Sequence, residues 1–332
     1  MTALPAASRN RRHRRSAACI ALALSCAAAT TAAQEYPAKP IRLIVPFAAG
    51  GPRDVQARLI GAHLAKAWGQ QLVIDNRGGA NGIIGSELAA HADPDGYTLL
   101  MISAGFAVNA TLYPKLPYDS LRDFAPVAPL SSGPGLLVVT PSLPVKSVGD
   151  LIDMARARRV ELLYASAGTG SPSHLAGELL KQMARIDMTH VPYKGMAAGI
   201  TDVGAGRVPM SIPTIPGALP LARSGKLRAL AVTGEKRSPS APEIPTVAES
   251  GVPGYAANNW YGISVPARTP ANIVARLNTE LNRATLAAAT RERLFEIGME
   301  PENGSSARFA EYVKNEIAKW ARVIKTTGLK PD

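Results

Sequence analysis

Two glycine-rich segments hold most of the residues in this chain that could bind a ligand. Residues 46–54 follow the β-rich run Ile41–Val45, and residues 165–174 occupy a similar place in the middle of the chain. Small residues let backbone N–H groups approach a ligand closely, and a helix that begins at such a turn adds partial positive charge. The combination favours an anionic ligand, although either segment alone could be only a tight strand-to-helix turn.

Two further turns, residues 103–105 and 190–195, also follow predicted strands. Ligands of open α/β sheets bind beyond the carboxyl ends of the strands, so we expect the four turns to contribute to one site. Asp54 is expected either to cap a helix or to organise its loop. The candidate ligand-binding residues in these turns are Phe47, Ala48, Ala49, Gly50, Arg53, Asp54, Ser103, Ala104, Gly168, Thr169, Gly170, Ser171, Ser173, His174, Tyr193 and Lys194.

The same residues give weak support for catalysis. Ser171 or Ser173 could work with His174 in a hydrolase, but the sequence identifies no acid and no oxyanion hole to complete the arrangement. His63 and His91 are expected to be structural or solvated, and no histidine after residue 33 has a metal-ligand spacing. We therefore expect a protein without enzyme activity, metal or cofactor, and keep the hydrolase as an alternative.

Residues 1–33 are predicted to be an export signal that is removed near Ala33. Five arginines precede a short alanine- and leucine-rich run, and none of the chain's 25 acidic residues lies in this stretch. The apolar run is shorter than the about 20 residues of a spanning helix, so we expect no membrane insertion after cleavage. A basic arm for nucleic acid is the alternative interpretation, and lipid attachment at Cys26 stays open.

Removal of this segment changes what the composition implies. The formal net charge of +12 falls to about +7, and both cysteines of the chain are lost with the signal. The mature chain would then have no disulfide and no cysteine metal site. Its basic residues are scattered and aromatic residues make up only 5% of the chain. Both facts argue against a nucleic-acid partner.

Short β-rich runs alternate with helical patterns, which predicts an α/β fold with a mainly parallel sheet covered on both faces. The expected strands are residues 41–45, 72–74, 97–102, 136–140, 162–166, 189–193, 208–212 and 227–233. The expected helices are residues 55–68, 147–158, 171–185, 196–204, 273–297 and 307–327.

Three helix starts are predicted from their side chains. Ser147 with Asp150 has the spacing of a capping box, and a hydroxyl cap precedes proline at Ser171 and at Thr269. The proline-rich residues 238–245 are expected to cross the surface and return the chain to its first lobe.

A series of motifs in a fixed order runs through nearly the whole chain after residue 33. They are residues 36–47, 50–54, 76–82, 95–99, 170–178, 190–195, 225–233 and 260–262. In this order they resemble the Bug family, the extracytoplasmic solute receptors of tripartite tricarboxylate transporters.

The resemblance implies a two-lobed periplasmic binding protein of type II, a flytrap, with a mainly parallel sheet in each lobe and a ligand cleft between them. We expect residues 34–136 and 255–332 to form lobe 1, and residues 137–254 to form lobe 2. A small carboxylate would be held largely by backbone amides, hydroxyls and waters, and delivered to membrane permease subunits by a monomeric receptor. A receptor that signals without feeding transport is the alternative, because it needs the same cleft.

Two positions depart from the family pattern. Arg53 stands where the family usually has a small hydroxyl residue, and Pro213 stands where many members have an aspartate. A ligand ammonium would lose a partner at position 213, so we expect a di- or aromatic carboxylate without an amine. Arg53 is expected either to point into solvent or to reach a second carboxylate.

Overall fold

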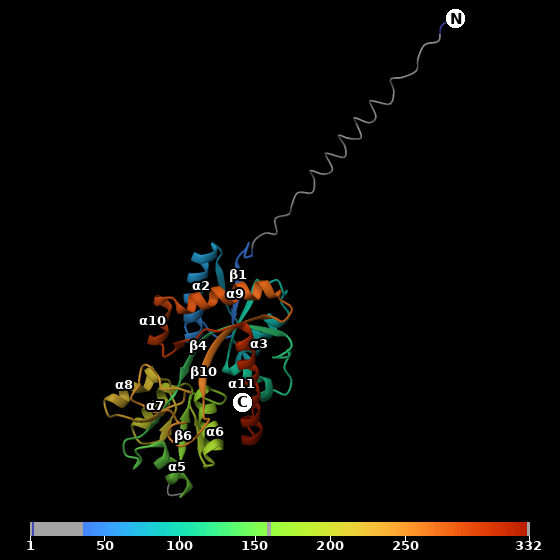
Figure 1. The fold of residues 1–332 in the computed structure, drawn as a ribbon. Helices are drawn as coiled ribbons and strands as arrows, with labels where there is room; N and C mark the ends of the chain where they lie inside the picture. The colour runs from blue at the N-terminus through green and yellow to red at the C-terminus, as the bar shows by residue number, and fades with distance from the viewer. Residues whose placement is uncertain (1, 3–35, 158–160, 331–332) are drawn as a thin grey trace. The chain divides into compact units, whose positions relative to one another are not determined.

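The computed structural model describes residue 2, residues 36–157 and residues 161–330. Apart from residue 2, the predicted export signal lies outside the described residues. Met1–Ala38 and Lys39–Asp332 are separate units, and the description that follows concerns the second unit. This unit holds two sheets, each of which forms a lobe with the helices around it (Figure 1).

The first lobe is built on a six-stranded sheet with the order β11-β4-β10-β3-β1-β2. The strands are β1 (Ile41–Val45), β2 (Leu72–Asn76), β3 (Thr98–Ser103), β4 (Phe124–Pro134), β10 (Asn258–Pro266) and β11 (Glu300–Pro301). The helices are α2 (Pro52–Trp68), η1 (Ala80–Gly82), α3 (Ile83–Ala90), α4 (Ala104–Leu112), α9 (Ala271–Leu286), α10 (Ala288–Glu296) and α11 (Ser306–Thr327). Helices α2, α9 and α10 lie on one side of the sheet, and α3 and α11 on the other (Figure 1).

The second lobe is built on a five-stranded sheet with the order β7-β6-β8-β5-β9. The strands are β5 (Leu136–Val139), β6 (Leu163–Ser166), β7 (Thr189–Pro192), β8 (Met210–Ser211) and β9 (Arg228–Val232). The helices are α5 (Val148–Arg156), α6 (Pro172–Ala184), α7 (Met196–Gly204) and α8 (Ile215–Arg223). Successive residues of β5 pack into different clusters on its two faces, so the whole strand is apolar.

Both sheets are mixed, and the prediction of mainly parallel sheets was wrong in this respect. Strand β1 is parallel to β2 and β3, whereas β10 is antiparallel to β3 and β4. In the second sheet β6 is parallel to β7 and β8, whereas β5 is antiparallel to β8 and β9. Strands β4 and β10 escaped prediction because β4 contains Pro126, Pro129 and Pro134, and because two register shifts interrupt its ladder with β10.

The remaining expected strands and helices are present, and the capping box of Ser147 and the hydroxyl cap of Ser171 are confirmed. The cap expected at Thr269 is wrong, because its hydroxyl donates to the carbonyl of Pro266 and α9 begins at Ala271. The single helix expected over residues 273–297 is divided into α9 and α10. Ala287 lies between them in an extended conformation, with φ −59° and ψ 137°.

The proline-rich residues 238–245 do not carry the chain back to the first sheet. The carbonyl of Pro245 accepts a hydrogen bond from the Val232 amide, which holds this segment beside β9. The chain returns at Ala257, directly before β10. The lobe boundaries expected after residues 136 and 254 lie near these connections and stay a prediction.

Thr233 joins the two connections between the sheets. The Gly135 amide donates to Thr233 Oγ1 at 2.7 Å, and the same hydroxyl donates to the carbonyl of Ala257 at 2.8 Å. The backbone of Thr233 also bonds to both Gly135 and Ala257. A Cβ atom at Gly135 would lie 2.7 Å from Ile212 Cγ2, so this crossing requires glycine.

A buried carboxylate fixes α11 on the first lobe. Glu316 is 5% exposed, and its Oε2 accepts hydrogen bonds from Trp260 Nε1 at 2.9 Å and Trp320 Nε1 at 3.0 Å. Lys319 pairs with Oε1 of the same carboxylate. Every polar atom of Glu316 therefore has a partner, as burial of a charge demands.

The C-terminal half of α11 reaches the second lobe. Gln182 Nε2 of α6 donates to Thr326 Oγ1 of α11 at 3.3 Å. One hydrophobic cluster continues from Ile44 and Leu100 of the first sheet through Val323 of α11 to Leu180 of α6. Helix α11 therefore packs on both lobes.

We expect Glu316→Ala to destabilise the protein by about 3 kcal/mol, because two buried indole N–H groups and Lys319 lose their acceptor. In a protein of this size the melting temperature should fall by roughly 5 °C. Urea unfolding followed by far-ultraviolet circular dichroism measures the change. Glu311→Ala, at an exposed position of the same helix, should change stability by less than about 0.5 kcal/mol. Equal stability of the two variants would contradict this role of Glu316.

Candidate functional site

Asp54 organises the first glycine-rich loop from within α2. Its carboxylate is 4% exposed and accepts hydrogen bonds from the Gly50 amide at 3.0 Å and from Arg58 Nε at 2.9 Å. The bonds from Arg58 and Gly50 hold the pKa of Asp54 below its usual range. The N-cap of α2 is Gly51, so of the two roles expected for Asp54 the structure shows the organisation of the loop.

The rest of this loop packs against the turn after β2. Asn76 Nδ2 donates to the carbonyl of Phe47 at 3.2 Å, and a Cβ at Gly78 would lie 3.4 Å from the Ala48 amide nitrogen. Residues 48–50 themselves are exposed. One side of the loop therefore packs against the turn after β2, and the backbone of residues 48–50 is open to solvent on the other side.

Arg53 lies between two aromatic rings. Its guanidinium carbon is 3.6 Å from the ring centroid of Phe47 and 5.1 Å from that of Tyr261, and Nη2 is 3.5 Å from Ser103 Oγ. Its Nε is buried and has no hydrogen-bond partner among the described residues. Burial lowers the pKa of Arg53, and no described carboxylate forms an ion pair with it. The solvent-facing orientation considered from the sequence is not the one observed.

Ser103 and Ala104 stand where β3 passes directly into α4, and both are buried. The turn after β2 is tied to this helix, because Asn81 Nδ2 donates to Asn109 Oδ1 and Asn109 Nδ2 donates to the Asn81 carbonyl, each at 2.9 Å. Sequence reasoning did not place Asn81, Asn109 or Tyr261 at the site. The glycine- and asparagine-rich residues 76–82 carried a signal, since they follow β2 as the first loop follows β1.

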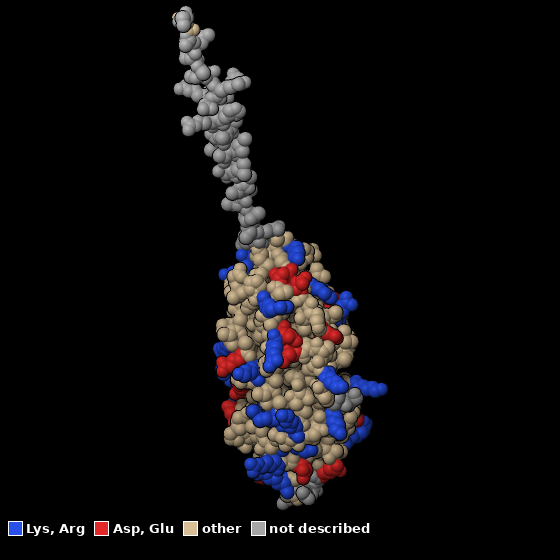
Figure 2. Space-filling model, turned by 90° about the vertical axis from the view of Figure 1, so that its right-hand side faces the viewer, with Lys and Arg blue, Asp and Glu red and all other residues tan. Residues whose placement is uncertain are grey.

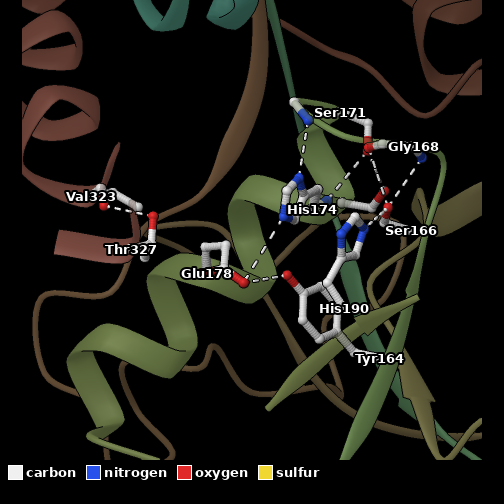
Figure 3. A network of polar contacts seen from close by, with 11 residues as sticks. Tyr164, Ser166, Gly168, Ser171, His174, Glu178, His190, Val323 and Thr327 are labelled. Atoms are coloured by element: carbon white, nitrogen blue, oxygen red, sulfur yellow. Dashed lines mark hydrogen bonds and ion pairs between the residues drawn. The ribbon is translucent and has the colours of Figure 1, made fainter. Parts of the chain in front are cut away.

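Side chains accept the backbone N–H groups of the second glycine-rich loop. The amides of Ala167, Gly168 and Gly170 donate to Ser173 Oγ, Ser166 Oγ and His174 Nδ1, each at 3.0 Å (Figure 3). The Ser171 amide donates to the Gly168 carbonyl. Among the described residues 167–174, the amides of Thr169 and Ser173 have no acceptor. The expectation that several amides of this loop face an anion is thus not matched by its hydrogen bonds.

His174 is buried and neutral. It is 3% exposed, and its ring stacks on that of His190 with centroids 3.7 Å apart and planes 6° from parallel (Figure 3). Burial, with the neighbouring His190, lowers the pKa of His174 to about 3. Because Nδ1 accepts the Gly170 N–H, this nitrogen carries no proton. His174 therefore positions the loop from behind.

Neither Ser171 nor Ser173 forms a dyad with His174, and the serine–histidine hydrogen bond of this region joins Ser166 Oγ to His190 Nε2 at 2.6 Å (Figure 3). Ser171 Oγ accepts the backbone amide of His174 at 3.3 Å and lies 3.1 Å from Ser173 Oγ. The ring of His174 instead meets the Gly170 amide and, at 3.9 Å, Glu178 Oε1. A general base must reach the hydroxyl that it activates, and neither serine hydroxyl bonds to this ring.

Three further candidates, Tyr193, Lys194 and Pro213, fall partly outside this arrangement. The Tyr193 carbonyl lies 3.4 Å from where a Cβ of Gly168 would stand, so its turn borders the second loop, but its hydroxyl donates to Asp202. Lys194 is exposed. Pro213 is buried, and its carbonyl accepts the Leu136 amide at 2.8 Å in the connection between the sheets.

One contact brings the second loop to the first lobe. A Cβ at Gly170 would lie 3.8 Å from Leu112 Cδ2, at the end of α4. The same helix begins at Ala104, next to Ser103 and Arg53. Residues that the sequence placed in two separate loops therefore lie at the two ends of one short helix.

Other features concern the wider chemistry of the chain. His63 Nε2 lies 3.0 Å from Glu280 Oε1 and links α2 to α9, which is a structural role. Over residues 36–157 and 161–330, no three His, Cys, Asp or Glu side chains gather as a metal site would require. In the same ranges every helix is too short or too polar to span a bilayer.

Comparison with known proteins identifies a family whose members have the same two-lobed fold. Residues 56–329 match the model of the tripartite tricarboxylate transporter family receptor, TctC. The chain is 37% identical to protein BugT of Bordetella pertussis over 94% of this chain and 96% of that protein.

Two solved structures are similar along most of the chain. Rpa4515 of R. palustris, whose structure is with adipate, is 42% identical with a TM-score of 0.73 and covers 90% of this chain and 100% of its own. MatC of Rhodopseudomonas palustris, with bound malate, is 34% identical with a TM-score of 0.69 and covers 87% of this chain and 100% of its own. The extent of the family match and of these identities shows that the chain belongs to the TctC, or Bug, family of tripartite tricarboxylate transporter receptors, which are binding proteins and not enzymes.

Proposed function

We propose that this receptor captures a small carboxylate between its two lobes and delivers it to the membrane subunits of a tripartite tricarboxylate transporter. The observation that carries the proposal is the state of Arg53. Arg53 is partly buried, its guanidinium lies against Phe47 and Tyr261, its buried Nε lacks a partner among the described residues, and no described carboxylate neutralises it. A buried charge is costly unless it is paired, and an anionic ligand would supply the pair.

The class of ligand follows from Arg53 together with position 213. The two similar structures hold adipate and malate, which are dicarboxylates without an amino group. Pro213 is buried and offers no side-chain acceptor to an ammonium. We therefore favour a di- or aromatic carboxylate without an amine as the ligand of this chain.

The two ends of such a ligand would meet different groups. Arg53 and Ser103 would hold one carboxylate through charge-assisted hydrogen bonds. The exposed backbone of residues 48–50 and the Thr169 amide would hold the other. Gly168, Gly170, Ser171, Ser173 and His174 would shape the second loop, and Tyr193 and Lys194 would border it.

The proposal includes the place where the receptor works. Similar solved structures include the periplasmic binding protein BugD and a periplasmic transporter. We propose that this chain is likewise exported to the periplasm, loses residues 1–33 near Ala33, and acts there as a monomer.

Adipate and hexanoate test the proposal, because they have the same carbon chain and differ by one carboxylate. We expect adipate to bind wild type at least tenfold more tightly than hexanoate in isothermal titration calorimetry. Arg53→Gln should weaken adipate by about 10- to 100-fold, as expected for a lost charge-assisted hydrogen bond. Lys66→Gln, at the exposed end of the same helix, is the control.

Unchanged adipate affinity in Arg53→Gln would show that Arg53 does not hold a carboxylate of the ligand. Failure of every mono-, di- and aromatic carboxylate to bind a folded wild-type protein would overturn the proposed function itself.

Malate and aspartate test the absence of an amine-binding group, since one carries a hydroxyl where the other carries an ammonium. We expect malate to stabilise the receptor in a thermal-shift assay and aspartate to have little effect. A ligand at a hundredfold excess over its Kd adds about 2.7 kcal/mol, which is a shift of several degrees. A larger shift with aspartate would contradict the assignment.

His174 predicts a pH dependence of stability. Its pKa is about 3 in the folded protein against 6.5 for an unperturbed histidine, so between these pH values the unfolded chain binds one more proton. The contribution of His174 should lower the free energy of unfolding by about 1.4 kcal/mol per pH unit below 6.5 and vanish above it. Urea unfolding at pH 7 and pH 5 should therefore show about 2 kcal/mol more loss in wild type than in His174→Asn. An identical loss in the two proteins would contradict a buried, neutral His174.

A further inference from the structure

A cavity of about 190 Å³ lies between β4, β10, the turn after β11 and the first turns of α11, and we call it the α11 cavity. Among its described lining residues, only Tyr261 also lies beside Arg53 of the candidate ligand site. A single water needs only about 15 Å³, so the cavity has room for a small organic molecule. The lining side chains that could hold such a molecule are Glu235, Asn258, Trp260, Glu302, Phe309 and Tyr312.

Three clustered aromatic rings line the α11 cavity. The ring of Trp260 meets those of Phe309 and Tyr312 edge to face, with centroids 6.0 Å and 5.5 Å apart. Phe309 and Tyr312 are three residues apart on α11, and their rings stack with centroids 6.4 Å apart. An aromatic face attracts a cation within about 6 Å of its centroid, and alkylated ammonium ions are well suited to such clusters. The rings therefore favour an organic cation with apolar groups around its charge.

Two carboxylates add negative charge to the same cavity. Glu302 Oε1 accepts a hydrogen bond from Ser132 Oγ at 2.8 Å, which holds this acid against β4. Burial raises the pKa of Tyr312, and the negative charges of Glu235 and Glu302 raise it further. Both acids therefore lie near the Tyr312 hydroxyl. A cation bound between them would reduce the repulsion of these like charges.

The two acids of the α11 cavity lack the basic partners that other carboxylates of this protein have. Figure 2 shows acidic and basic side chains mixed over one face of the molecule, and Asp202 and Glu249 each pair with an arginine. Among the described residues, neither Glu235 nor Glu302 forms an ion pair. Arg308 also lines the cavity, but it is exposed and pairs with neither acid. Two acids and one base leave the lining with a net negative charge.

Asn258 supplies an unused hydrogen-bond acceptor in this lining. Its Oδ1 is buried and has no partner among the described residues. A buried acceptor without a donor is costly, and a ligand that brings a donor removes this cost. The ligand should therefore carry an O–H or N–H group as well as its positive charge.

We propose that the α11 cavity binds a small alkylammonium ion that carries a hydrogen-bond donor. The aromatic rings would contact its alkyl groups, Glu235 and Glu302 would balance its charge, and Asn258 Oδ1 would accept from its donor. This site goes beyond carboxylate capture, because its ligand has the opposite charge. The residues that would hold the cation are also distinct from those of the candidate ligand site.

Choline and the neutral alcohol in which carbon replaces its nitrogen test the proposal, because they share shape and hydroxyl and differ in charge. We expect choline to bind wild type at least about tenfold more tightly in isothermal titration calorimetry. Glu302→Gln should weaken choline by about tenfold and Tyr312→Leu by about fivefold, whereas Tyr312→Phe keeps the ring and should bind within about twofold of wild type. Glu292→Gln removes the same charge from an exposed position of α10 and is the control.

Equal affinity for choline and the alcohol, or no binding of choline to folded wild type, would overturn the proposal. So would unchanged choline affinity in Glu302→Gln and Tyr312→Leu, or an equal loss in Glu292→Gln, which would show that net charge alone matters. Circular dichroism confirms that each variant is folded. Saturating choline should leave the affinity for adipate within about twofold, and competition between them would place choline in the candidate ligand site instead. Choline binding and carboxylate capture can therefore fail independently.

Discussion

Two indole N–H groups and a lysine converge on the buried carboxylate of Glu316, and the packing of α11 on the first lobe depends on this contact. One of the indoles belongs to Trp260 of β10. Side chains alternate along a strand, so the next residue, Tyr261, faces the opposite side of the sheet, where its ring covers Arg53. A single carboxylate thus fixes the helix that joins the lobes and the strand that forms one wall of the candidate site.

Two arginines of α2 differ in their exposure and in whether a carboxylate pairs with them. Arg58 is exposed and takes both oxygens of Asp54, the acid of the first loop. Arg53, five residues earlier, is partly buried between two aromatic rings and forms no ion pair with a described carboxylate. In the second lobe the loop amides are already bonded to Ser166, Ser173 and His174. The charge available to an anion is therefore concentrated on one guanidinium, and the loops mainly shape the space around it.

Local patterns in the sequence predicted what depends on neighbours along the chain. The buried strands, the capping box of Ser147 and the turns after β1 and β6 follow from residue type and spacing. Strands β4 and β10 did not, because their prolines and register shifts hide a ladder formed between distant segments.

In the candidate site, too, local sequence predicted some residues, and contacts between distant segments decided their surroundings. Sequence analysis identified Arg53 and His174 as notable, but Tyr261, one of the two rings beside Arg53, comes from β10, and the His190 imidazole that stacks on His174 comes from β7. The environment of each side chain decides whether it can face a ligand or must support a loop.

Thr233 has a mechanical consequence for the two connections between the sheets. Its hydroxyl accepts from Gly135 in one connection and donates to Ala257 in the other, so the two segments cannot slide past each other without breaking these bonds. Two independent connections would allow the lobes both to shear and to swing. Because the Thr233 side chain joins the two connections, rotation of the lobes about a common hinge axis is the low-energy motion.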